Sequence, residues 1–371
     1  MAKLTFFPLG NADCCLIDLA DKQKILLDFG NQRDPDNPDD KRIDLAEALR
    51  KDLAEAEREC FDYVGFTHLD RDHVNRASEF FWFDYSKKYQ GEGRIKINTL
   101  WVPAAVIIEE KPDFEDADAI QAEARHRLRE GYGIRVFSGP NRLEAWLKKN
   151  GIAPESRARF ITNAGELVPG LTTHANGVEF FVHCPFAHRT DCGNELDRND
   201  DSLVLQATFL EAGRETKLVL GSDITHQIWA KIVELTRRFK NDERLEWDVF
   251  KLSHHCSYTA LGPEKGKTKT EPIPEVKWLF EDRGQQGGIV ISTSDPIPLD
   301  DTDQPPHKQA AAYHEDTKKG RDGKFIITME HPSAASPEPL VISIDGLGTT
   351  VRLRHLGGIG VITSRSAPRA G

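Results

Sequence analysis

The amino-acid sequence predicts a layered α/β domain that includes antiparallel strand pairs. Short apolar runs alternate along the chain with segments of helical periodicity, which is the order expected of sheets covered by helices. The 371 residues include 39% hydrophobic and 29% charged side chains. A chain of this length and composition buries a sizeable core and is too apolar to remain disordered.

The N-terminal part is predicted to begin with short strands that are followed by a helix. Residues 44–59 carry Leu45, Leu49 and Leu53 at helical spacing, which indicates an amphipathic helix. Residues 31–41 are rich in Asp, Pro and Asn, which is typical of a loop. The strands expected in this part are 3–7, 14–18, 24–28 and 63–67.

The rest of the chain continues the alternation. A charged, helix-favouring segment at about 104–150 predicts a helical excursion at one edge, and residues 224–238 indicate a further helix. Residues 262–274 and 294–306 have the Gly, Pro and Asp content of loops. The expected strands are 178–184, 203–209, 217–221, 249–252, 287–293, 325–329, 340–344 and 350–353. We therefore expect a main domain over 1–330 and a small β-rich closing element with a tail over 331–371.

Charge and cysteine content narrow the possible partners and compartments. The formal net charge is −11, which disfavours wrapping around duplex DNA. No apolar run approaches the roughly 18 residues needed to span a bilayer, and the N-terminus lacks the apolar stretch of a secretory signal. We expect a cytoplasmic protein that does not contact membranes. No pair of cysteines has CxxC spacing, which predicts six free thiols: Cys14, Cys15, Cys60, Cys184, Cys192 and Cys256.

The most informative segment is Thr-His-Leu-Asp-Arg-Asp-His at 67–73, directly after a predicted strand. Its side chains His68, Asp70, Asp72 and His73 are imidazoles and carboxylates, the groups that hold zinc, manganese or iron. Alone, the segment is more typical of a helix start that is capped by its aspartates. The metal-site interpretation depends on partners elsewhere in the chain.

Such partners follow three other predicted strands. Asp28 ends the strand 24–28, Asp223 follows the strand 217–221, and the pair His254 and His255 follows the strand 249–252. Each of these clusters is a weak signal by itself, because a strand that ends in a polar turn is common. Together with residues 67–73 they predict a metal centre where several strands end.

The order of these motifs resembles the metallo-β-lactamase fold, a four-layer αββα sandwich, over roughly residues 3–330. Within that superfamily the chain is most similar to the hydrolase domain of ComEC-type competence proteins. The matching motifs are Gly10-Asn11-Ala12-Asp13, Ile25 to Gly30, Thr67 to His73, Asn199 with Ser202 to Leu205, Leu218 to Asp223, and Lys251 to Ser257.

The chain departs from the family pattern at several positions. Arg76 and Cys256 stand where the family has glycine, and Ser222 separates Gly221 from Asp223, which are usually adjacent. Asp70 stands where many superfamily members carry a second histidine. The third-motif histidine of the wider superfamily has no clear equivalent, and Asn199 or Asp200 occupies its place, with His183 a poorer candidate.

The resemblance implies two divalent ions, zinc or manganese, of which the second is bound more weakly. The stronger site would use Asp72, His73, Asp223 and one of His254 and His255, with Asp223 bridging to the weaker site. The weaker site would use His68, Asp70 and either Asn199 or Asp200. The residues expected to serve catalysis are Asp72, Asp28, His255 and Lys251, and those expected on the substrate side are Asp13 near the mouth, Asn199, Ser202, Ser257 and His307.

These features predict a metal-dependent hydrolase that attacks a phosphodiester with a metal-activated water, as a nuclease or nucleotide phosphodiesterase. The expected partner is an anionic substrate such as single-stranded nucleic acid or a nucleotide. A lactone, thioester or amide is the alternative substrate, because the same ion pair supports those reactions. A non-catalytic metal-binding scaffold or sensor is the alternative from another functional class.

Overall fold

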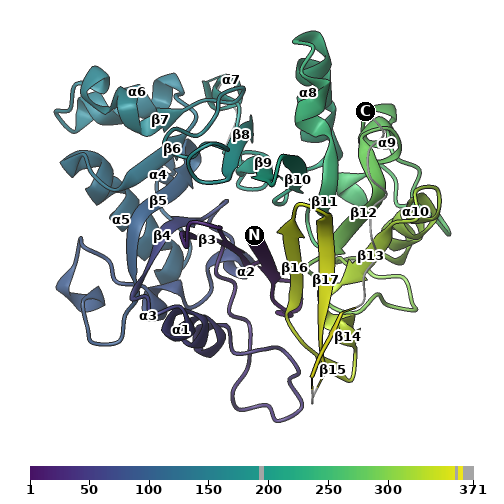
Figure 1. Ribbon diagram of the computed structural model, residues 1–371. Helices are drawn as coiled ribbons and strands as arrows, with labels where there is room; N and C mark the ends of the chain where they lie inside the picture. Colours follow the sequence, from purple (N-terminus) through teal and green to yellow (C-terminus); the bar gives the residue numbers. More distant parts are fainter. Residues whose placement is uncertain (192–195, 356–357, 362–371) are drawn as a thin grey trace.

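The computed structural model describes residues 1–191, 196–355 and 358–361, and its framework is two mixed β-sheets that pack face to face (Figure 1). The larger sheet has ten strands. In their order across the sheet these are β18 (Gly358–Val361), β17 (Gly348–His355), β16 (Leu340–Asp345), β1 (Ala2–Phe6), β2 (Cys15–Asp18), β3 (Lys24–Leu27), β4 (Cys60–Gly65), β5 (Lys96–Pro103), β6 (Ile134–Phe137) and β7 (Ile161–Thr162). Strands β3 to β7 are parallel, and the other neighbouring pairs are antiparallel.

The second sheet has six strands. In order these are β13 (Lys324–Ile327), β12 (Gly284–Ser292), β11 (Trp247–Lys251), β10 (Arg214–Leu220), β9 (Val204–Glu211) and β8 (Val178–Cys184). Strands β10 to β13 are parallel, whereas β8, β9 and β10 form antiparallel pairs. A separate two-stranded ribbon pairs β14 (Pro332–Ser333) with β15 (Ser336–Pro337).

Helices cover the outer faces of both sheets (Figure 1). On the ten-stranded sheet these are α1 (Leu45–Glu55), α2 (Arg71–Val74), α3 (Ala77–Phe80), α4 (Ala104–Ile108), α5 (Glu115–Glu130) and α6 (Asn141–Lys149). On the six-stranded sheet they are α8 (His226–Arg238), α9 (Pro274–Glu281) and α10 (Lys308–Lys319), and the short α7 (Ala187–Asp191) lies near α6. Short 3₁₀ turns complete the secondary structure: Lys87–Tyr89, Pro154–Phe160, Asp242–Leu245, Tyr258–Ala260 and Thr328–Glu330.

Three apolar cores hold these layers together. One lies between the two sheets, and the other two lie between each sheet and its helices. Trp101 of β5 packs against Phe180 of β8 across the sheet interface, with ring centroids 5.5 Å apart. The predicted α/β class and its four αββα layers are therefore confirmed.

Local sequence explains the helices that were predicted. Helix α1 begins after Asp44, whose carboxylate accepts a hydrogen bond from the Glu47 N–H at 3.1 Å, and it buries Leu45, Leu49 and Leu53. Helix α8 likewise buries one apolar face, which includes Ile228, Trp229 and Ile232.

Other segments differ from the prediction. The helical excursion at about 104–150 contains α4, α5 and α6, but it also contains β6, which joins the ten-stranded sheet. Strand β5 and helices α9 and α10 were not predicted. The C-terminal strand β16 pairs along its length with β1, so this segment is continuous with the main sheet.

The predictions about membrane-spanning segments and free thiols concern the residues that the structure describes. Among them, no helix is both long and apolar enough to cross a bilayer. Five of the six predicted free thiols are free: Cys14, Cys15, Cys60, Cys184 and Cys256. Cys192 lies outside the described residues.

The packing between the sheets predicts the effect of truncating Trp101, which is 1% exposed. Trp101→Ala should lower the free energy of unfolding by about 3–5 kcal/mol, because it removes a large buried ring and leaves a cavity. Urea denaturation followed by circular dichroism measures this loss. Leu347→Ala is the control, since Leu347 is 70% exposed and its truncation should change stability by less than about 0.5 kcal/mol. Equal effects of the two substitutions would contradict the assignment of this core.

Candidate metal centre

The side chains of the predicted metal centre, including Asp28, which was predicted to orient ligands, come from four segments that meet at one edge of the two sheets. In the ten-stranded sheet, Asp28 follows β3, while Asp72 and His73 follow the parallel strand β4. In the six-stranded sheet, Asp223 follows β10 and His255 follows the parallel strand β11. Because neighbouring parallel strands end at the same edge, the loops after them converge there.

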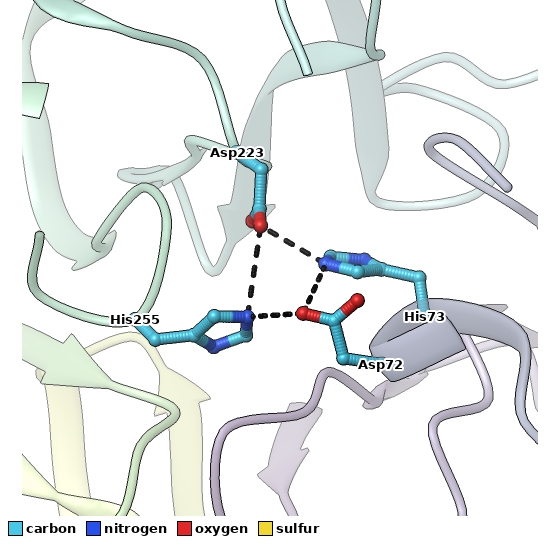
Figure 2. Close-up of side chains that lie close together, drawn as sticks. All are labelled: Asp72, His73, Asp223 and His255. Carbon is cyan, nitrogen blue, oxygen red and sulfur yellow. Dashed lines mark hydrogen bonds and ion pairs between the residues drawn. The ribbon is translucent and has the colours of Figure 1, made fainter. Parts of the chain in front are cut away.

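Asp72, His73, Asp223 and His255 form a compact cluster (Figure 2). The Nε2 atom of His255 lies 2.9 Å from Asp72 Oδ2 and 3.6 Å from Asp223 Oδ2. The Nε2 atom of His73 lies 3.3 Å from Asp223 Oδ1 and 4.0 Å from Asp72 Oδ2. Ligands of a tetrahedral zinc ion are roughly 3.3–3.8 Å apart, since each lies about 2.0–2.3 Å from the metal. The spacing of the four side chains therefore fits a divalent cation among them.

Hydrogen bonds on the far side of each imidazole orient the cluster. His73 Nδ1 donates to Asp28 Oδ2 at 2.9 Å, and His255 Nδ1 donates to the Thr293 carbonyl oxygen at 2.7 Å. Asp28 is itself held by the Thr67 N–H at 2.7 Å and the Thr67 hydroxyl at 2.8 Å. These contacts place the proton on Nδ1 and leave Nε2 of both rings facing the cluster, which is the arrangement found behind metal-binding histidines.

Several polar atoms of the cluster are buried without a hydrogen bond. Among the described residues, His73 Nε2, Asp223 Oδ1 and the neighbouring His68 Nε2 have no hydrogen-bond partner. A buried polar atom without a partner costs about 1–3 kcal/mol. A bound cation satisfies such atoms, so the donor set fits a divalent metal ion by its chemistry as well as by its spacing.

The charges of the cluster are strongly coupled. Burial lowers the pKa of His73, but Asp223, Asp28 and Asp72 raise it more, and the net pKa lies well above its ordinary value. Burial likewise lowers the pKa of His255, while Asp223 and Asp72 raise it to about 9. Burial raises the pKa of the carboxyl groups of Asp72 and Asp223. The neighbouring His73 and His255 lower it by more, so the net pKa of both carboxyl groups lies below the usual range. Both carboxylates thus stay ionised and available as ligands.

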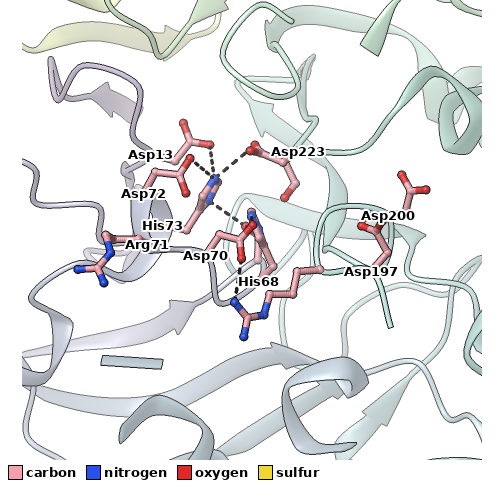
Figure 3. A network of polar contacts seen from close by, with 12 residues as sticks. Asp13, His68, Asp70, Arg71, Asp72, His73, Asp197, Asp200 and Asp223 are labelled. Carbon is pink, nitrogen blue, oxygen red and sulfur yellow. Dashed lines mark hydrogen bonds and ion pairs between the residues drawn. The ribbon is translucent and has the colours of Figure 1, made fainter. Parts of the chain in front are cut away.

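The residues predicted for the weaker site are less well assembled (Figure 3). His68 Nε2 is 3.8 Å from Asp70 Oδ2, but Asp70 Oδ1 accepts a hydrogen bond from Arg198 at 3.1 Å. Asp200 is engaged at the start of α8, where its Oδ1 accepts hydrogen bonds from the Thr225 hydroxyl at 2.9 Å and N–H at 3.3 Å. Asn199 Oδ1 is buried and has no partner among the described residues. The structure thus brings His68 and Asp70 together and holds Asp200 in other contacts.

Lys251 and Asp13 form a buried ion pair behind the cluster. Lys251 Nζ donates to Asp13 Oδ2, and the Thr293 hydroxyl donates to Asp13 Oδ1. The sequence places Asp13 near the mouth, whereas its side chain is 5% exposed and its Oδ2 lies 3.7 Å from His73 Nε2. Burial lowers the pKa of Lys251, but Asp13 and Asp223 raise it more, so this ammonium group stays charged.

The remaining predicted residues surround this centre without joining it. His254 is half-buried, and its Nδ1 has no partner among the described residues. Ser202 is fully buried, and Ser257 forms a hydrogen bond with the Thr259 hydroxyl at 2.8 Å. His307 precedes α10 and accepts a hydrogen bond from the Tyr258 N–H at 3.3 Å. His183 donates to the Arg244 carbonyl oxygen at 2.9 Å.

Sequence reasoning did not identify Thr67, Thr293 or Arg198. Thr67 opens the His/Asp motif, and Thr293 directly follows a buried strand, as the predicted site residues do. Their positions therefore carried a usable signal. Nothing in the local sequence marks Arg198 as a partner of Asp70, because the two residues are 128 positions apart.

The three residues that depart from the family pattern lie in left-handed turns. Arg76, Ser222 and Cys256 have φ values of 63°, 45° and 64°. This left-handed region favours glycine, since a side chain there meets the adjacent backbone. These turns therefore hold larger residues in a conformation that favours glycine.

Comparison with known proteins gives similarity at the level of solved structures alone. No family model matches the chain, and no curated protein matches it. One similar structure is unliganded yeast PDE1, with a TM-score of 0.45 and 11% identity over 88% of this chain and 97% of that one. Another is a diphosphatase from the PhnP family, with a TM-score of 0.33 and 11% identity over 93% of this chain and 98% of that one.

A third similar structure is the metallo-β-lactamase GOB-18 from Elizabethkingia meningoseptica. Its TM-score is 0.31, with 11% identity over 68% of this chain and 77% of that one. All three TM-scores are below 0.5. The αββα assignment therefore depends on the sheets and cores of this chain and not on these neighbours.

The hydrogen bond from His73 to Asp28 predicts a loss of metal affinity in Asp28→Asn. An amide is a weaker acceptor than a carboxylate, so His73 would become less basic and less well oriented. We expect zinc affinity to fall about 10–100-fold, as is usual when such a partner is removed. Competition with a chromophoric chelator measures the change. Asp300→Asn, at an exposed loop position, should leave affinity unchanged, and similar values for both variants would contradict the role of Asp28.

The left-handed backbone at Arg76 predicts a stabilising substitution. Its N–H donates to Asp116 Oδ2 at 2.9 Å, a contact that glycine retains. Arg76→Gly should raise the free energy of unfolding by about 0.5–1 kcal/mol, because the relief of strain exceeds the added entropy of the unfolded chain. Lys231→Gly, inside α8, should instead destabilise by about 1 kcal/mol. Urea denaturation of both variants tests the sign, and destabilisation by Arg76→Gly would refute this reading of the turn.

Proposed function

We propose that the chain is a metal-dependent hydrolase of phosphodiesters, with a nucleotide or single-stranded nucleic acid as its substrate. The observation that carries this proposal is the cluster of Asp72, His73, Asp223 and His255, whose ligand atoms lie within 4.8 Å of one another. The motif resemblance to ComEC-type hydrolase domains supports the choice of substrate class.

In this proposal the cluster would hold the first ion, and His68 and Asp70 would contribute to a second. When bound, divalent cations supply Lewis-acid chemistry, because they acidify water and offset negative charge on substrate oxygens. Asp223 faces both histidines of the cluster and is the residue expected to contribute to both ions. Asp28 and the Thr293 carbonyl keep the imidazoles aimed at the cluster.

Charge balance supports an anionic substrate. The buried centre contains four carboxylates, Asp13, Asp28, Asp72 and Asp223, and one ammonium, Lys251. With neutral imidazoles these four carboxylates and Lys251 sum to −3, and the adjoining network of Arg198 with Asp70, Glu109 and Asp113 is not part of this sum. One divalent cation would bring the total to −1 and two would bring it to +1. The doubly loaded centre is therefore the state that attracts a phosphodiester.

Burial assigns a positioning role to Lys251. Its side chain is 6% exposed and its ammonium is bonded to Asp13, 4.0 Å from Asp223. A group in this position holds Asp13 and moderates the repulsion among the carboxylates. His254 is half-buried beside the cluster and remains the candidate proton donor to the leaving group.

The charge balance predicts how turnover depends on metal content. Protein stripped with a chelator should be inactive towards bis(p-nitrophenyl) phosphate, remain weakly active with one equivalent of Zn²⁺ or Mn²⁺, and become fully active with two. Hydrolysis of an uncharged lactone should depend less on the second ion, because no anion needs to be attracted. Product absorbance at each metal-to-protein ratio measures both.

Matched variants complete this test. Asp72→Ala should abolish turnover of bis(p-nitrophenyl) phosphate and of labelled single-stranded DNA, whereas Asp300→Ala should retain it. A preference for the lactone at every metal content would favour the alternative substrate class. Metal binding without turnover of any of these substrates would favour the non-catalytic scaffold.

A further inference from the structure

Arg198 connects the second ligand set to an acidic loop on the opposite side of a cleft. Its Nη1 lies 3.1 Å from Asp70 Oδ1 and 3.1 Å from Asp113 Oδ2, and its Nε donates to Glu109 Oε1 at 3.0 Å. One guanidinium thus serves three carboxylates. Because one guanidinium faces three carboxylate groups, carboxylates outnumber cations in this network.

The cleft beside this network has a volume of about 420 Å³. Asp70, Glu109, Asp113, Arg198 and Asn199 all line it. A wall with more carboxylates than cations favours a further cation over an anion. The cleft therefore offers a route by which a cation can approach Asp70.

The two carboxylate oxygens of Asp70 face different groups. Oδ1 accepts a hydrogen bond from Arg198, and Oδ2 faces Nε2 of His68. His68 is 2% exposed, its Nε2 has no hydrogen-bond partner among the described residues, and it lies 3.8 Å from Asp70 Oδ2 (Figure 3). The imidazole thus aims a free ligand atom at a carboxylate that a guanidinium already holds. A cation that binds His68 and Asp70 has to compete with Arg198.

We propose that Arg198 is a built-in competitor of the second cation, which holds Asp70 while only the first ion is bound. The second ion enters by taking Asp70 from the guanidinium. Arg198 then stays paired with Glu109 and Asp113, so its charge is not left without a partner. The proposal rests on the proposed function only in placing a second ion at His68 and Asp70, and it makes Arg198 the residue that sets the affinity for that ion.

The test measures metal binding and not turnover. Protein loaded with one equivalent of Zn²⁺ is titrated with Mn²⁺, and free Mn²⁺ is followed by electron paramagnetic resonance. Arg198→Met should tighten Mn²⁺ binding about tenfold, the scale of one charge-assisted hydrogen bond, and leave the first ion unchanged. Arg58→Met is the matched control, because it removes an arginine from an ion pair with Asp62 on β4 and should change neither affinity.

A second variant gives the opposite sign. Glu109→Gln removes one of the other partners of Arg198, so the guanidinium should hold Asp70 more firmly and Mn²⁺ should bind more weakly. Arg198→Lys keeps the charge without the forked geometry and should fall between wild type and Arg198→Met. Thermal unfolding of each variant with one ion bound shows whether the fold is retained.

Weaker or unchanged Mn²⁺ binding in Arg198→Met and in Arg198→Lys would overturn the proposal, since Arg198 would then support Asp70 or be indifferent to the ion. Absence of a second ion in every variant would also overturn it. Phosphodiester turnover by the wild type would in that case leave the proposed function standing. Conversely, the variants could show the expected order of Mn²⁺ affinity while the wild type hydrolyses no phosphodiester. That result would support the competition between Arg198 and the cation and would contradict the proposed function.

Discussion

The concentration of carboxylates between the two sheets is the constraint on which the rest of the centre depends. Asp13, Asp28 and Asp223 are each less than 5% exposed, and Asp72 reaches the same cluster from a partly exposed position. Two such charges about 4 Å apart repel each other by about 4 kcal/mol at an effective dielectric constant of 20. Lys251 offsets one charge. The fold therefore retains this arrangement only with further positive charge, whether from protonated imidazoles or from bound cations.

Backbone conformation shows how the chain maintains that arrangement. Asp28, Ser222 and the three consecutive residues His254, His255 and Cys256 all have φ between 45° and 64°. A non-glycine residue in this region is strained, and several in one place persist only where surrounding contacts over-determine them. Those contacts are present here: Asp28 bonds Thr67 and His73, and the His254 N–H donates to the Ser222 carbonyl oxygen at 3.0 Å. The strain is used to aim side chains from both sheets at one point.

Much of the fold followed from local sequence, and the failures have physical causes. Strand β8 was predicted with its observed bounds, because its residues are mostly apolar and aromatic, with only Glu179 and His183 between them. Helix α10 was not predicted, since it buries Gln309 and His314 and so lacks an apolar stripe. Strand β5 begins with Lys96, Asn98 and Thr99 around a single buried Ile97, and its continuous apolar part follows only at Leu100. The C-terminal strands β16 and β17 were predicted, but the pairing of β16 with β1 was not, because it joins residues more than 330 positions apart and no local pattern reports it.

Sequence reasoning predicted the site residues that directly follow strands. It did not predict contacts between distant segments, such as that between Asp70 and Arg198. The cluster residues follow strands, so their convergence was predictable, and the choice of His255 over His254 depended on a turn.

The two ligand sets differ in the contacts that hold their side chains. His73 and His255 are fixed from behind by Asp28 and a backbone carbonyl, whereas Asp70 is 36% exposed and held by a long side chain from another segment. A ligand set fixed by the backbone of the sheets binds its ion without reorganisation, and one that must first exchange an arginine binds more weakly. In the proposed two-ion centre, unequal affinity would therefore follow from which contacts hold each ligand, even before the softer and harder character of the donor atoms is considered.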